Sequence, residues 1–174
     1  MSKLIIQPNN QDHIQGKENS RITLVEYGDF ECPYCSDAHT IVKEIQKIKG
    51  DVLRFVFRNF PLTEIHSYAL HAAYAAEAAG KQHKFWEMHD ILLENQENLK
   101  DSDLRLYSEK LSLDIDQFTK DMNSDEVAKK VQADIIGGIR SGVNGTPTFF
   151  INNIRFDDPS DLDSLLEAID LADK

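Results

Sequence analysis

The residues of this chain that are most suited to chemistry are its only two cysteines, Cys32 and Cys35, which are three positions apart. That spacing lets both sulfurs form one disulfide across the first turn of a helix. Residues 21–27 form a strand pattern, and apolar residues recur at helical spacing after Cys35. The free N–H groups and positive dipole end of a helix that begins at the pair favour a thiolate at Cys32. The pair therefore predicts thiol–disulfide chemistry.

A metal site is the alternative interpretation of the same residues. Cys32, Cys35 and His39 have ligand-like spacing, and His66 or His71 would supply a fourth zinc ligand. Structural zinc sites usually bring more cysteines than two. We therefore expect a redox pair that uses neither a metal nor a cofactor, because the two sulfurs carry both electrons.

Composition limits the class of protein. A chain of 174 residues suggests a single domain that can bury a proper core. The formal charge of −11 argues against nucleic-acid partners and against a polybasic membrane contact. The apolar run at residues 4–6 is far shorter than the roughly 7–15 residues of a signal core. We expect a cytosolic monomer, or a periplasmic protein if a leader has been removed.

Hydrophobic periodicity predicts the order of the elements. The expected elements of the first third are a strand at 4–6, a loop at 8–20, a strand at 22–27, a helix ending near Gly50 and a strand at 52–58. From about residue 64 to 142 the pattern is helical. Its first helix carries a stripe that starts at Ile65 and Tyr68, and its last has a capping box at Asn123 and Glu126.

Strand patterns return at residues 148–151 and 154–156, around a candidate tight turn at Asn152-Asn153. A final helix carries an apolar stripe from Leu162 to Ile169. The flanking strand pairs are too small to form separate sheets. The helical block of residues 62–142 is therefore expected to be an insertion into one α/β domain, 1–174, whose core is 1–61 and 143–174.

Two separated motifs resemble those of DsbA-like thiol–disulfide oxidoreductases, which have the thioredoxin fold. The run 26–35 (Glu-Tyr-Gly-Asp-Phe-Glu-Cys-Pro-Tyr-Cys) is similar to the family's active-site segment. The run 145–151 (Gly-Thr-Pro-Thr-Phe-Phe-Ile) is similar to its cis-proline loop, and the helical block to its inserted helical domain. The resemblance implies a thioredoxin-like α/β fold, a mixed sheet flanked by helices, with an inserted all-helical subdomain.

The resemblance also assigns roles to individual residues. It implies that Cys32 is the exposed nucleophile and Cys35 the buried resolving thiol. Pro147 matches the cis proline that packs against the disulfide. Thr146 precedes it, at the position whose backbone pairs with a substrate peptide in the family.

Glu26 matches the position where related folds carry a buried acid near the resolving cysteine. Its neighbours Leu24 and Val25 indicate a buried strand, which would raise the pKa of the carboxyl group. The resemblance favours proton transfer at Glu26, and a hydrogen-bonded structural acid is the alternative.

The residues between the cysteines are expected to tune the redox potential. Strongly oxidising family members carry Pro-His there, whereas this chain carries Pro33-Tyr34, as many glutaredoxins do. Tyr34 cannot supply a positive charge, and acidic side chains nearby oppose a thiolate. The potential is thus expected between roughly −270 and −120 mV, the values of thioredoxin and DsbA. None of the six histidines is assigned a catalytic role.

The expected function is disulfide exchange with protein thiols and disulfides, with glutathione or a reductase as the regenerating partner. Two alternatives remain. One is a glutathione-linked transferase or isomerase on the same fold, which would depend on glutathione and act on small electrophiles. The other is a redox-sensing interaction module, which would form its disulfide without multiple turnover.

Overall fold

A five-stranded mixed sheet forms the centre of the protein, described here by a computed structural model for residues 2–158 and 160–174. The strand order is β1-β3-β2-β4-β5, with β2 and β3 parallel and the other pairs antiparallel. The strands are β1 (His13–Gln15), β2 (Ile22–Gly28), β3 (Leu53–Asn59), β4 (Thr148–Ile151) and β5 (Ile154–Phe156). This mixed sheet with its flanking helices confirms the predicted thioredoxin-like fold.

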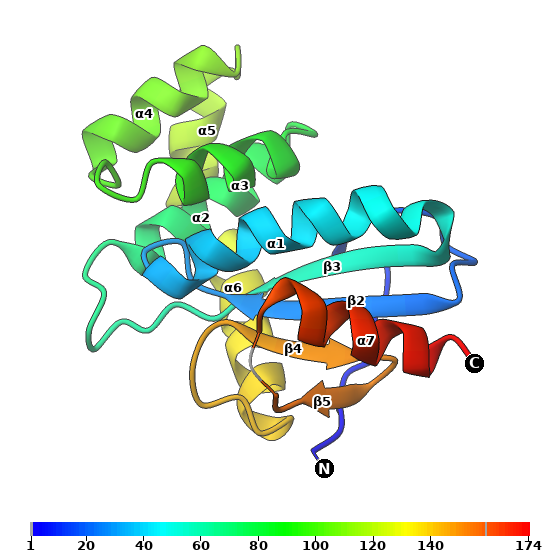
Figure 1. Ribbon diagram of the computed structural model, residues 1–174. Helices are drawn as coiled ribbons and strands as arrows, with labels where there is room; N and C mark the ends of the chain where they lie inside the picture. Colours follow the sequence, from blue (N-terminus) through cyan, green and yellow to red (C-terminus); the bar gives the residue numbers. More distant parts are fainter. Residues whose placement is uncertain (1, 159) are drawn as a thin grey trace.

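Helices cover both faces of the sheet and gather beyond one of its ends (Figure 1). They are α1 (Pro33–Lys49), the 3-10 turn η1 (Gly50–Val52), α2 (Ala69–Gly80), α3 (Phe85–Glu94), α4 (Asp101–Lys110), α5 (Ile115–Met122), α6 (Asp125–Arg140) and α7 (Leu162–Ala172). α1 and α7 share one face of the sheet, and α1 begins at the end where α2 to α5 gather (Figure 1). None of the helices in the described part of the chain has the length and apolar character needed to cross a membrane.

Side chains alternate between two hydrophobic cores along β2, as the pleat of a strand requires. Leu24 belongs to the larger core, with residues of α1, α3 and α7. Val25 and Tyr27 belong to a smaller core on the opposite face, against which Ile135 of α6 packs. Glu26 follows Leu24 by two positions, so its carboxyl group lies on the face of the larger core.

The structure corrects the prediction for the N-terminal segment. Residues 4–6, expected to be a strand, form none, and the only pairing beside them in the described chain is an isolated bridge between Lys3 and Ile154. β1 lies instead inside the expected loop of 8–20, where it forms one edge of the sheet and pairs with β3. Its three residues, His-Ile-Gln, are too few and too polar to show an alternating pattern. Leu4 is buried in the smaller core without belonging to a strand.

The start of α2 is a second correction. The expected stripe included Ile65 and Tyr68, but these side chains are 72% and 41% exposed. They belong to the segment between β3 and α2, and the helix begins only at Ala69. α6, for which the sequence predicted a capping box at Asn123 and Glu126, has Ser124 as its N-cap instead. The Ser124 hydroxyl accepts a hydrogen bond from the N–H of Val127.

α6 lies inside the predicted insertion of 62–142, yet it packs on β3 of the central sheet as well as on α2 and α5. Gly137 and Gly138 allow this close approach, because a Cβ at Gly138 would lie 2.8 Å from a ring atom of Phe60. The helical block is thus tied into the α/β core at its C-terminal end.

Candidate active site

The two cysteines lie where β2 gives way to α1. β2 ends at Gly28, and the turn that follows places Cys32 as the N-cap of α1, with Pro33 in its first turn. The N–H of Cys35 donates to the Cys32 carbonyl at 3.0 Å. No side chain caps the helix end. Free N–H groups and the positive end of the helix dipole therefore act on the Cys32 sulfur.

Cys32 is a thiol whose sulfur is held against the proline loop. Its Sγ donates to the Thr146 carbonyl at 3.4 Å. The hydrogen bond from Cys35 lowers the pKa of Cys32 to about 5, against the opposing effect of burial and with help from Thr146. The residue is only 3% exposed, so the prediction of an exposed nucleophile is wrong in degree. The Thr146 backbone lies against the sulfur and limits its exposure.

Cys35 is buried like its partner, but its pKa is shifted in the opposite direction. It is fully buried, and the N–H of Asp29 donates to its Sγ at 3.4 Å. Burial, the hydrogen bond to Cys32 and the charge of Glu26 raise the pKa of Cys35 well above its ordinary value. At neutral pH the pair therefore holds its negative charge on Cys32 and a proton on Cys35.

Glu26 is 1% exposed, and its Oε1 has no hydrogen-bond partner among the described residues. Burial, followed by the negative charge of Cys32, raises its pKa to about 8. The carboxyl group is therefore protonated at neutral pH and close enough to both sulfurs to influence their titration. This environment is suited to proton exchange, and the catalytic role itself stays a prediction.

The second motif meets the first across the sheet. β4 begins at Thr148, which pairs with Tyr27 of β2, and the Thr146–Pro147 peptide bond just before it is cis. Thr146 and Pro147 are partly exposed beside Cys32. The structure thus places both residues where a substrate backbone could approach the sulfur.

Exposed apolar side chains lie on the cysteine turn and on the segment hydrogen-bonded to it. Tyr34, between the two cysteines, is 72% exposed. The segment that carries Ile65 and Tyr68 is fastened to the cysteine turn by hydrogen bonds: Tyr68 N–H donates to Glu31 at 2.8 Å. We call Tyr34, Ile65 and Tyr68 the apolar rim of the site.

The structure adds site residues that sequence reasoning missed. The side chain of Asp29 is fully buried and lies 2.8 Å from Nδ1 of His66. Gln96, after α3, donates to the carbonyls of Phe30 at 2.9 Å and Cys32 at 2.7 Å. These partners are 37 and 64 or more positions apart in sequence, so spacing gives no signal for either contact.

The histidines considered as zinc ligands each contact a carboxylate group, and His66 does so at the cysteine turn, with its Nδ1 2.8 Å from Asp29. His39 contacts Glu94 at 3.1 Å, and His71 contacts Asp101 at 2.7 Å. The group in the described chain with ligand atoms close enough for a metal ion is His39, His89 and Asp90, without a cysteine. Lys43 lies 2.7 Å from Asp90 and already supplies a cation there.

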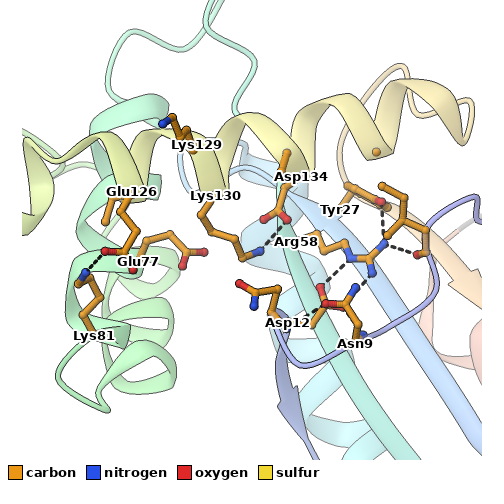
Figure 2. Close-up of a pocket in the computed structure, with 15 residues that line it drawn as sticks. Asn9, Asp12, Tyr27, Arg58, Glu77, Lys81, Glu126, Lys129, Lys130 and Asp134 are labelled. Carbon is orange, nitrogen blue, oxygen red and sulfur yellow. Dashed lines mark hydrogen bonds and ion pairs between the residues drawn. The ribbon is translucent and has the colours of Figure 1, made fainter.

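A separate cavity of about 490 Å³ lies between the N-terminal segment, the sheet, α2 and α6 (Figure 2). Ion pairs join several of its charged groups. The guanidinium of Arg58 donates twice to Asp12 at 2.8 Å, and Lys130 donates to Asp134 at 2.6 Å. Neither cysteine lines it. The Arg58–Asp12 pair fastens the N-terminal segment to β3, and the Asn59 N–H donates to Asp134 at 3.0 Å, which ties α6 to the same strand.

Comparisons with known proteins agree with this geometry. The family described as thioredoxin matches residues 8–171. A Na(+)/H(+) antiporter, NhaA 1 of Salinispora arenicola, is 44% identical over 160 residues; the match covers 92% of this chain but 24% of that protein. The chain thus spans about a quarter of the length of the first curated relatives it matches.

Two solved structures have the same fold. A thioredoxin-like oxidoreductase from Silicibacter pomeroyi is 26% identical, with a TM-score of 0.85 over 94% of this chain and 93% of that one. Alpha-DsbA1 of Wolbachia pipientis is 21% identical, with a TM-score of 0.84 over 99% and 96%. From its family match over residues 8–171, with which the fold and the Cys-x-x-Cys helix agree, this chain belongs to the thioredoxin family.

Proposed function

We propose that this protein is a thiol–disulfide oxidoreductase that exchanges disulfides with protein substrates. The observation that carries the proposal is the asymmetry of the pair: the pKa of Cys32 is lowered to about 5, while that of Cys35 is raised. A nucleophilic thiolate next to a protonated, buried thiol is the arrangement that exchange through a mixed disulfide requires.

The reaction balances without a cofactor. In the reducing direction the Cys32 thiolate attacks a substrate disulfide, one substrate sulfur leaves as a thiolate, and a mixed disulfide forms. Cys35 then loses its proton and attacks Cys32, which releases the second substrate thiolate and leaves the Cys32–Cys35 disulfide. Two electrons pass to the substrate, and the reverse sequence oxidises a substrate dithiol.

Polypeptides suit this site better than small thiols do. The apolar rim exposes three large side chains around a sulfur that is itself only 3% exposed. A protein substrate can cover such a surface, while its backbone can pair beside Thr146 and Pro147. Glutathione or a reductase is proposed as the regenerating partner, and the protein is proposed to act as a monomer.

Two variants and a turnover assay test the function. Cys32→Ser is expected to abolish reduction of insulin disulfides, and Cys35→Ser to accumulate mixed disulfides with protein substrates, detected by mass spectrometry. Trapping by Cys32→Ser instead would reverse the two roles. A disulfide that forms without repeated insulin turnover would indicate a sensing module, and glutathione-dependent activity on small electrophiles would indicate a transferase or isomerase.

A further inference from the structure

The backbone of Asp29 forms a hydrogen bond with each of the two cysteines. Its N–H donates to Cys35 Sγ at 3.4 Å, and its carbonyl accepts from the N–H of Cys32 at 3.1 Å. A group attached to Asp29 is therefore positioned relative to both sulfurs. Any charge held at its side chain has a fixed place beside the redox pair.

The side chain of Asp29 is held just as firmly. Its Oδ1 accepts from the N–H of Glu31 at 2.7 Å, and its Oδ2 accepts from the N–H of Leu62 at 2.8 Å. Nδ1 of His66 lies 2.8 Å from the same Oδ2. Within the described chain, His66 is the only basic side chain paired with this carboxylate. A buried carboxylate is strongly destabilising without a cationic partner, so the pair favours a protonated imidazole.

On the basis of the proposed exchange reaction, we propose that His66, anchored by Asp29, supplies the positive charge that stabilises the Cys32 thiolate. Tyr34, at the position where strong oxidants carry histidine, cannot supply that charge. His66 is a positioning residue in this scheme, because it acts through the field at the sulfur and through Asp29. His66 belongs to the segment between β3 and α2, whereas the histidine of strong oxidants lies within the Cys-x-x-Cys motif.

The charges around His66 support this assignment. Burial lowers the pKa of His66, but the hydrogen bond to Asp29 and the negative charges of Asp29, Cys32 and Glu31 raise it above its ordinary value. Glu64, on the same segment, is exposed. Because coupling between two titrating groups is reciprocal, a thiolate that favours the imidazolium is itself favoured by it.

The coupling gives the imidazole a part in the proton balance. When a substrate dithiol reduces the Cys32–Cys35 disulfide, two electrons and two protons leave the substrate. One proton goes to Cys35, and Cys32 stays a thiolate. The second proton is taken up in part by His66 and is otherwise released to water.

The test is a titration of Cys32 by its thiolate absorbance in the dithiol protein. His66→Gln should raise the Cys32 pKa by about 0.5–1 unit, the size expected for losing one nearby charge in a partly solvated site. His66→Lys, which keeps the charge, should stay near the wild-type value. His71→Gln is the matched control, because His71 also contacts a carboxylate, that of the 74% exposed Asp101, but outside the site.

A second measurement needs no variant. The His66 pKa, followed by NMR, should be higher in the dithiol form than in the disulfide form. An unchanged Cys32 pKa in His66→Gln, or equal His66 titration in both forms, would overturn the inference. If the Cys32 pKa rose equally in His66→Gln and His66→Lys, the inference would also be overturned, because the shape of the side chain and not its charge would then matter. Insulin reduction by the wild-type protein is measured separately. If the wild type is active but His66→Gln leaves the Cys32 pKa unchanged, only this inference is rejected. If the wild type is inactive but the Cys32 and His66 pKa values shift as expected, only the proposed function is rejected.

Discussion

Of three buried groups at the site, one is charged and two are protonated at neutral pH. The pKa of Cys32 is lowered to about 5, that of Glu26 is raised to about 8, and that of Cys35 is raised well above its usual value. Cys32 is therefore charged while both neighbours carry protons. When Cys35 must lose its proton to resolve a mixed disulfide, Glu26 is the nearby group whose pKa lies closest to neutral pH.

The raised pKa of Glu26 predicts a specific pH dependence of stability. Between about pH 4.5 and pH 8 the folded protein keeps a proton that the unfolded chain has lost. The contribution of Glu26 to the free energy of unfolding should therefore fall as pH rises through this window and become flat above it, whereas the lowered pKa of Cys32 contributes with the opposite sign. Glu26→Gln cannot titrate, so its stability relative to wild type should increase by about 3–5 kcal/mol from pH 4.5 to pH 8.

Urea unfolding of the dithiol proteins at several pH values measures this difference. Glu64→Gln, at an exposed position, is the control and should follow the wild type. A difference between Glu26→Gln and wild type that stays constant with pH would contradict a raised pKa at Glu26.

At the scale of elements, the approach of α6 to the sheet depends on a residue without a side chain. In most helices Gly→Ala stabilises by about 1 kcal/mol. At Gly138, however, an added Cβ would lie 2.8 Å from Phe60 and 3.0 Å from Tyr27. We expect Gly138→Ala to lower the free energy of unfolding by about 1–3 kcal/mol, because overpacking outweighs the gain in helix propensity.

Denaturant unfolding of Gly138→Ala checks this expectation. Gly145→Ala is the matched control, since nothing lies within 4 Å of a Cβ there and its φ is not positive. A stabilised Gly138→Ala variant would show that α6 can move away from the sheet without loss.

Elements with a strong local pattern were predictable. α1, β2, β3 and the β4–β5 turn, where Asn152 and Asn153 have positive φ, all follow from periodicity and turn chemistry. β1 was missed because an edge strand of three residues is defined by its partner. The segment between β3 and α2 was assigned to a helix because Ile65 and Tyr68 have helical spacing, although they face solvent.

Some residues of the site were also predictable from the sequence, and others were not. Cys32, Cys35, Pro147 and the burial of Glu26 could be inferred from two motifs and the character of one strand. Asp29 and His66 could not, because their contact depends on where the β3–α2 segment folds back. No histidine has a catalytic role that spacing predicts, and the contact between His66 and Asp29 is a purely tertiary feature.

For the whole molecule, the open question is the direction in which electrons flow. A thiolate stabilised in the dithiol form makes the disulfide a stronger oxidant, as the pKa values of about 7 for thioredoxin and 3.5 for DsbA illustrate. The Cys32 pKa of about 5 lies between them. Interpolation between their potentials of about −270 and −120 mV, with about one pKa unit on either side of 5, gives roughly −140 to −230 mV for this protein.

Equilibration with glutathione buffers, followed by quantification of the dithiol fraction, measures this potential. In a cytosol held at roughly −220 to −320 mV, a pair at the expected potential stays a dithiol and acts as a reductant. In an oxidising compartment the same pair would act as an oxidant, so the compartment sets the direction. A measured value at or above about −120 mV would show that the helix end and nearby cations outweigh the local carboxylates, which would make the protein a strong oxidant wherever it resides.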